Sequence, residues 1–358
     1  MKIFTPFPIQ DVTVHNRLIR SATCEYMADE TGCPDDRFLS LYQTLAKGEI
    51  GIVVTGFCYV MENGKSTPGQ CGIHDDALIP AWKEVTSLFR NTSSILLMQI
   101  VHGGRQVRPK GHVGPIWAPS AVPDPAYKTT PVEMGTADIQ TVVQAFSDAA
   151  RRAEAAGFQG IQLHMGHGYL LSQFLSPYTN RRSDAYGGDQ SKRTRLAADI
   201  VRAIKETVSP GFLVTAKINA EDCLGGGLIL NQAVISAMVL EKAGLDMIEV
   251  SGGMAESTLG PVRKDILKTE DEGYYRFHGG AIRRSVDIPV ATVGGFRSLD
   301  LMEQTLESGD ADFIGLSRPF VREPDLAVKM RENRSQKSEC ISCNRCFNPR
   351  GLQCAHVS

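Results

Sequence analysis

The stretch that decides the fold is GIQLHMGHGYLLSQFLSP, which runs from Gly160 to Pro177. Its first part, Gly160–His164, is a short apolar run of the kind that forms a buried β-strand. Two imidazoles, His164 and His167, stand where this strand ends. α/β barrels place their chemistry at the carboxyl ends of their strands, so this stretch indicates one strand of such a barrel.

Seven further short runs, many of them β-branched, are spread along the chain. The eight predicted strands are Leu18–Thr23, Ile52–Thr55, Ile95–Ile100, Gly160–His164, Leu213–Ile218, Met247–Val250, Pro289–Val293 and Phe313–Leu316. Because the runs are continuously apolar rather than alternating, we expect parallel strands that are buried on both faces.

Helical patterns separate these runs. The clearest is capped by Thr136, is stopped by Gly157, and has one apolar face formed by Ile139, Val142, Val143, Phe146, Ala149, Ala150 and Ala153. Two more are expected over Asn231–Ala243, with Val234, Ile235, Met238 and Val239 inward and Gly244 at the end, and over Lys192–Val208, with Leu196, Ile200, Ala203 and Ile204 inward. Eight strands alternating with helices predict a (β/α)8 TIM barrel.

An open doubly wound sheet is the structural alternative, and it predicts a glycine-rich dinucleotide turn after the first strand. Here the first strand runs into Cys24-Glu-Tyr-Met without such a turn, which favours the barrel. Two long loops, Val101–Gly135 and Ser251–Glu272, follow the third and sixth strands. They lie at the carboxyl ends of strands, where barrels place their chemistry, and loops of this length are usually functional lids or partly disordered.

Composition excludes several classes of function. The chain has 358 residues, of which 42% are hydrophobic and 22% charged, as in ordinary globular proteins. A net charge of −2 offers no basic field for nucleic acid. The longest apolar stretches, such as Ile95–Ile100, are too short to cross a membrane, and residues 1–10 do not resemble a signal peptide. We therefore expect a cytoplasmic protein.

Polar residues at the expected strand ends are the candidate site. His164 and His167 can donate hydrogen bonds to a developing oxyanion, and the Tyr169 hydroxyl can protonate a carbon. The alternative is that they are satisfied loop residues; zinc is disfavoured because no carboxylate or third histidine lies nearby in sequence. Gln99 and Lys217 end two other strands, and the lysine needs an anion unless it snorkels out.

The loops after the seventh and eighth strands fit a phosphate. They contain Gly294, Gly295, Ser317 and Arg318. Barrels often bind phosphate there, because glycine exposes backbone N–H groups and arginine pairs with the anion. An ordinary tight turn is the alternative at each loop.

At this point the sequence resembles the old yellow enzyme family of FMN-dependent ene-reductases, from Asn16 to about Pro324. The resemblance is carried by NRLIRSATCEY (16–26), QIVHGGR (99–105), APS (118–120) and, most specifically, the HGYL, QFLSP, NRRSD and YGG elements between His164 and Gly188. The family implies an FMN-binding barrel, here over residues 1–335, that takes hydride from NAD(P)H and reduces the C=C bond of a small-molecule enone.

The resemblance also implies roles for individual residues. Ser21, Ala22, Thr23 and Cys24 would line the flavin edge, Gly56 and Phe57 would lie beside the ring, Gln99 and Lys217 would meet its pyrimidine part, and Gly294, Gly295, Ser317 and Arg318 would hold the phosphate. His164 and His167 would bind the substrate carbonyl, Tyr169 would donate the proton, and Tyr26 would contact substrate. Family members usually have arginine where this chain has Lys217.

Four cysteines crowd the end of the chain: Cys340, Cys343, Cys346 and Cys354. This C-x2-C-x2-C-x7-C spacing, in a tail over residues 336–358, indicates a metal site, either a [4Fe-4S] cluster or structural zinc, with a metal-free tail as the third alternative. The tail resembles the cluster segment of the 2,4-dienoyl-CoA reductase branch, although its spacing differs. There the cluster leads to an FAD domain, for which we expect no room before Ser358.

Three hypotheses follow. The first is NAD(P)H-dependent ene-reduction. The second is an FMN reductase or demethylating dehydrogenase that receives electrons through the cluster from a separate electron-transfer partner. The third is a flavin-free barrel acting on a phosphorylated sugar, which gives Gln99, Cys24 and the paired histidines no role. The sequence leaves the choice between NADH and NADPH, and that between a monomer and a homo-oligomer, open.

Overall fold

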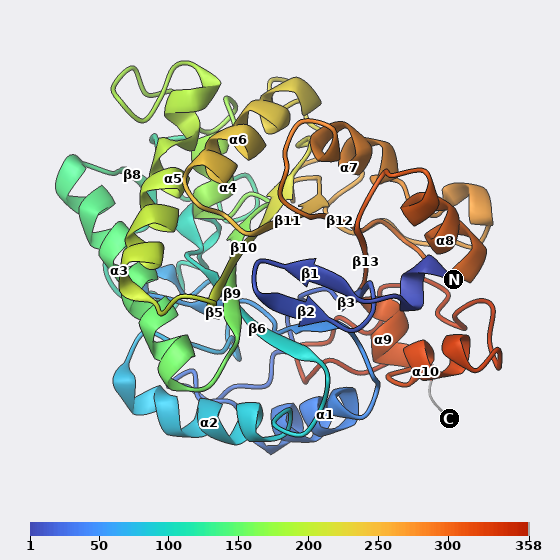
Figure 1. Cartoon of the computed structure of the whole chain (residues 1–358). Coiled ribbons are helices and arrows are strands. Elements are labelled where there is room, and N and C mark those ends of the chain that lie inside the picture. The colour runs from blue at the N-terminus through green and yellow to red at the C-terminus, as the bar shows by residue number, and fades with distance from the viewer. Residues whose placement is uncertain (357–358) are drawn as a thin grey trace.

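A closed ring of parallel strands forms the centre of the computed structural model, which describes residues 1–356 (Figure 1). The ring consists of β3 (Leu18–Arg20), β4 (Ile52–Val54), β6 (Ile95–Val101), β9 (Gly160–Met165), β10 (Leu213–Asn219), β11 (Met247–Ser251), β12 (Val290–Thr292) and β13 (Phe313–Leu316). It closes because β3 pairs with β13 and β4 pairs with β6. The predicted (β/α)8 barrel and its eight strands are therefore confirmed, with ends that shift by up to three residues.

Helices surround the ring in the order that a barrel requires. They are α1 (Asp36–Ala46), α2 (Ile79–Ser87), α3 (Thr136–Ala155), α5 (Gln190–Thr207), α6 (Leu230–Lys242), α7 (Arg276–Arg283), α8 (Leu299–Glu307), α9 (Arg318–Arg322) and α10 (Leu326–Arg331). The additional short elements are η1 (Lys2–Phe4), β5 (Cys58–Tyr59), η2 (Glu62–Gly64), η3 (Asp76–Leu78), η4 (Gly104–Gln106), β7 (Trp117–Ala118), β8 (Val132–Glu133), α4 (Leu170–Leu175) and η5 (Thr269–Asp271). Within residues 1–356, no helix combines the length and apolarity needed to cross a bilayer.

A hairpin covers the amino-terminal end of the barrel. Its strands, β1 (Phe7–Ile9) and β2 (Val12–Val14), lie across the centre of the ring in Figure 1. Ile9 and Val14 join a separate apolar cluster with the first residues of the barrel strands, such as Leu213 and Met247. Because this end is filled by side chains, the open end of the barrel is the carboxyl end.

Two features of the helices differ from the sequence prediction. Gly135, not Thr136, is the N-cap of α3, and its N–H donates to Asp138 Oδ2 at 2.8 Å. In α6 the expected inward residues Ile235 and Met238 are 41% and 40% exposed. The buried face of α6 instead consists of Ala233, Ser236, Ala237 and Leu240. Small side chains there allow close packing on α5, where Gln190 Nε2 donates to Ser236 Oγ.

A buried carboxylate joins the ends of β3 and β4. Glu25 Oε1 accepts hydrogen bonds from Arg20 Nη2 at 3.0 Å, from the Tyr42 hydroxyl at 2.8 Å and from the Gly56 N–H at 2.9 Å. Arg20 also donates to the carbonyl of Val54. This network replaces water around two buried charges, and it fixes the loop that enters the candidate site.

Gly56→Ala tests how tightly this network is packed. A Cβ on Gly56 would lie well inside van der Waals contact with the Glu25 carboxylate and with the Thr23 carbonyl. We expect the free energy of unfolding to fall by about 2 kcal/mol in urea titrations, because overpacking of a rigid buried site is destabilising. Gly225→Ala is the matched control, since a Cβ there meets nothing within 4 Å. Equal stability of the two variants would contradict the argument.

Candidate active site at the carboxyl end of the barrel

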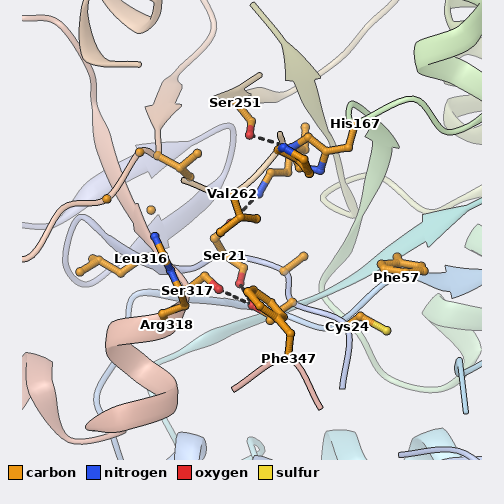
Figure 2. A pocket seen from close by; sticks show the side chains of 18 of the residues that line it. Ser21, Cys24, Phe57, His167, Ser251, Val262, Leu316, Ser317, Arg318 and Phe347 are labelled. Carbon is orange, nitrogen blue, oxygen red and sulfur yellow. Dashed lines mark hydrogen bonds between the residues drawn. The ribbon is translucent and has the colours of Figure 1, made fainter. Parts of the chain in front are cut away.

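A cavity of about 350 Å³ opens at the carboxyl ends of the strands (Figure 2). It brings together fifteen of the sixteen residues that the sequence assigns to catalysis, substrate or cofactor. These are Ser21, Ala22, Thr23, Cys24, Tyr26, Phe57, Gln99, His164, His167, Tyr169, Lys217, Gly294, Gly295, Ser317 and Arg318. Gly56 is the exception, because it lies behind this wall against Glu25.

Lys217 already has an anionic partner inside the protein. Its ammonium lies 3.3 Å from Glu249 Oε1 and donates to Ser21 Oγ at 2.7 Å. Lys217 and Glu249 are direct neighbours in the register of β10 and β11. The lysine therefore does not extend to solvent, and Glu249 neutralises its charge without a bound anion. Sequence reasoning missed Glu249, although a glutamate within the apolar run MIEV was a visible signal.

The two histidines form a corner of the cavity, with ring centroids 5.2 Å apart and ring planes nearly perpendicular. His164 Nδ1 accepts from the Gly166 N–H, which leaves the proton on Nε2. His167 Nε2 lies 2.9 Å from the hydroxyl of Ser251, as Figure 2 shows. His167 also has a positive φ of 61°, a strained conformation that is characteristic of functional sites.

Both histidines are neutral at physiological pH. Burial, together with the positive charge of Lys217, lowers the pKa of His167 to about 3. Burial, His167 and Lys217 also hold the pKa of His164 well below its usual value. Neutral imidazoles can each donate one hydrogen bond without bringing a further charge into the cavity. This suits the stabilisation of an oxygen that becomes negative during a reaction.

Tyr169 stands next to the histidines and keeps its proton. Its ring centroid is 4.8 Å from that of His164 and 5.2 Å from that of Phe57. Burial raises the pKa of Tyr169, so its hydroxyl remains a donor at neutral pH. Burial and the neighbouring Glu25 raise the pKa of Cys24 to about 12, so this thiol is neutral as well.

The opposite end of the cavity is lined by glycine, hydroxyl and guanidinium groups. Gly295 has a φ of 76°, and a Cβ there would lie 2.9 Å from Tyr274 Cε1. Thr23 Oγ1 and Ser317 Oγ lie 2.6 Å apart. Arg318 uses Nη1 to donate to the carbonyls of Arg263 and Ser342 and to Asn344 Oδ1. Within residues 1–356 its Nε and Nη2 groups donate to no protein atom, so they are available to an anion.

The cysteine tail forms part of the same region. Ser342, Asn344 and Phe347 line the main cavity, and the Leu352 N–H donates to the Glu25 carbonyl. Sequence reasoning missed these residues, as it missed Ser251 and Tyr274, because separate segments come together only in the fold. The tail therefore packs onto the barrel as far as residue 356; Val357 and Ser358 lie outside the described residues.

All four tail cysteines line a second cavity of about 250 Å³, together with Arg318 and Asn344. Arg318 and Asn344 thus belong to the walls of both cavities. Within residues 1–356, however, no three histidine, cysteine or acidic side chains converge closely enough to hold a metal ion as they stand. Burial raises the pKa of Cys346 to about 11.

Comparisons with known proteins identify the family of the chain. The model of a family described as the NADH:flavin oxidoreductase / NADH oxidase family matches residues 2–337. The chain is 34% identical to the NADH oxidase of Thermoanaerobacter brockii over 346 residues, 96% of this chain and 52% of that protein. It is 34% identical to the NADPH dehydrogenase of Bacillus licheniformis over 324 residues, 90% of this chain and 92% of that protein. The chain spans about half the length of several curated relatives that it matches.

A solved structure supports the fold. The old yellow enzyme homologue from Zymomonas mobilis superposes with a TM-score of 0.81 at 23% identity, covering 95% of each chain. At this identity the likeness concerns the fold alone. The family model and the sequence relatives confirm the resemblance noted from the motifs.

The buried neutral histidines predict a pH-dependent stability. Burial lowers the pKa of His102 and His167 to about 3, against about 6.5 in an unfolded chain. Between these values the unfolded state binds more protons, so acidification below pH 6.5 favours unfolding. We expect urea titrations to show a loss of about 1 kcal/mol per histidine for each pH unit below pH 6. A free energy of unfolding that stays constant from pH 7 to pH 5 would contradict the neutral assignment.

Proposed function

The chain belongs to the NADH:flavin oxidoreductase / NADH oxidase family, and we propose that it uses FMN and NAD(P)H to reduce the C=C bond of α,β-unsaturated carbonyl compounds. The observation that carries this proposal is the corner formed by His164, His167 and Tyr169 in the main cavity. It combines two neutral hydrogen-bond donors with a protonated hydroxyl. These groups suit the reduction of an enone, whose carbonyl oxygen gains negative charge and whose neighbouring carbon gains a proton.

The residues present fit FMN. One end of the cavity has Gln99 and Lys217, which suit the polar edge of an isoalloxazine ring. The other end has Gly294 and Gly295, where side chains would collide with Tyr274, and the free N–H groups of Arg318. A glycine cradle beside an arginine suits a phosphate. FMN supplies the hydride chemistry when it is bound, and NAD(P)H supplies the electrons.

The protein groups have distinct tasks in this proposal. The histidines hold the substrate carbonyl oxygen and stabilise the charge that develops on it. Tyr169 donates a proton to the carbon next to the carbonyl, because its raised pKa keeps the hydroxyl protonated. Phe57 packs against both Tyr169 and His164 and keeps them in place. Tyr26, whose pKa burial and Cys24 raise to about 12, lines the cavity and contacts substrate.

The four cysteines around the second cavity favour a second candidate function. We infer that they hold a [4Fe-4S] cluster or a zinc ion after their side chains have turned toward a common centre. Four thiolates are the ligand set that either would need. If the tail holds a cluster, that cluster would pass electrons to FMN from a separate protein, and direct oxidation of NADH would be poor. Zinc has no redox chemistry and would only stabilise the tail.

One absorption experiment separates these possibilities. Anaerobically purified protein is scanned alone, after NADH, and after cyclohexenone. We expect flavin bands that bleach with NADH and return with the enone. A broad brown shoulder in the same scan supports the cluster, and its absence argues for zinc or a metal-free tail. Flavin bands that NADH does not bleach would favour the partner-fed alternative, and protein without flavin even after FMN is added would overturn the proposal.

Tyr169→Phe tests the proton donor. We expect enone turnover to fall roughly 100-fold, since general acid catalysis contributes on this scale. Stopped-flow reduction of the flavin by NADH should be unchanged, because that step needs no proton from Tyr169. Tyr186→Phe is a matched control on a hydroxyl that bonds Asp199 away from the cavity. An unchanged enone rate in Tyr169→Phe would refute the assignment.

A further inference from the structure

A chain of buried polar side chains lies beneath the main cavity. It joins four barrel strands and the residue that follows a fifth, and it consists of Ser21, Gln99, Gln162, Lys217 and Glu249. Glu249 and Gln162 have no solvent exposure, and Gln99 is 1% exposed. Polar groups this deeply buried are stable only when each is matched by a partner of the opposite hydrogen-bonding type.

Glu249 determines which group donates and which accepts in the hydrogen bonds that link these side chains. Three donors converge on its carboxylate: Ser21 Oγ at 2.5 Å, Lys217 Nζ at 3.3 Å and Gln162 Nε2 at 2.7 Å. An ionised carboxylate can only accept hydrogen bonds. The amide nitrogen of Gln162 must therefore face Glu249, and its Oε1 must face the other way.

The direction continues to Gln99. Gln162 Oε1 lies 2.7 Å from Gln99 Nε2 and accepts its hydrogen bond. The carbonyl oxygen of Gln99 is then left over, and no residue within 1–356 donates to it. Because Gln99 lines the main cavity, this oxygen is an acceptor for a bound molecule.

We propose that Glu249 is a positioning residue that orients the Gln99 amide through Gln162, so that the cavity selects a cofactor with an N–H donor at its pyrimidine edge. The inference rests on the proposed binding of FMN, whose N3–H is such a donor. Neither Glu249 nor Gln162 lines the main cavity. Both act only by fixing which end of Gln99 faces the cavity.

Two substitutions separate this role from simple packing. Glu249→Gln keeps the shape of the side chain but turns an N–H toward Gln162, which reverses the Gln162 and Gln99 amides. Adding Gln162→Glu to this variant moves the carboxylate from position 249 to position 162, which is its neighbour in the row of hydrogen-bonded side chains. In this double variant the new amide at position 249 donates to the new carboxylate at position 162. That carboxylate accepts from Gln99, so the original orientation of the Gln99 amide returns.

The test measures dissociation constants for FMN and for 3-methyl-FMN, which carries a methyl group on N3 instead of hydrogen. Each flavin is titrated with the 358-residue chain freed of its own flavin, and the flavin fluorescence is followed. We expect wild type to prefer FMN, Glu249→Gln to reduce that preference about tenfold, and the double variant to restore it. Glu206→Gln is the matched control, because it also removes one carboxylate but does so on the exposed side of α5.

Each outcome decides between the two proposals. Wild type that binds FMN, with the same preference in wild type and Glu249→Gln, would overturn the orientation role and leave the proposed function standing. Wild type that fails to bind either flavin would overturn both. If Glu249→Gln does not fold by circular dichroism, the folded double variant still decides: a preference unlike that of wild type counts against the inference.

Discussion

The interior carboxylate of Glu249, which water does not reach, is the constraint on which the site depends. Burying such a charge costs several kcal/mol unless donors surround it. Lys217 on β10, Gln162 on β9 and Ser21, which directly follows β3, supply those donors. Their positions are therefore set by the closed barrel itself. The polar layer they form separates the apolar filling near the hairpin from the cavity above.

Much of this arrangement could be predicted from the sequence, because barrel strands have a simple signal. Continuous apolar runs marked all eight strands, and the polar residues after them marked the cavity. Lys217 was recognised as a buried charge, but its partner was not. Glu249 stands in the next strand of the ring, and only the register between β10 and β11 places the two side by side.

The remaining misses have related physical causes. The inward face of α6 is made of alanine and serine, because the neighbouring helix comes close, whereas a search for large apolar residues selects the exposed face. Ser251 and Tyr274 join the cavity from loops whose paths no local pattern specifies. Phe347 lies in the cysteine tail, and the spacing of the cysteines contains no information about the wall on which the tail packs.

The hairpin β1–β2 restricts how ligands can enter and leave the barrel. It fills the amino-terminal end of the barrel with side chains such as Ile9 and Val14, so the barrel has a closed floor and no ligand can pass through it along its axis. A ligand that enters at the carboxyl end must therefore also leave at that end. Two ligands that need the same floor must occupy it in turn, and the first must depart before the second arrives. Alternating occupancy is thus a consequence of the architecture.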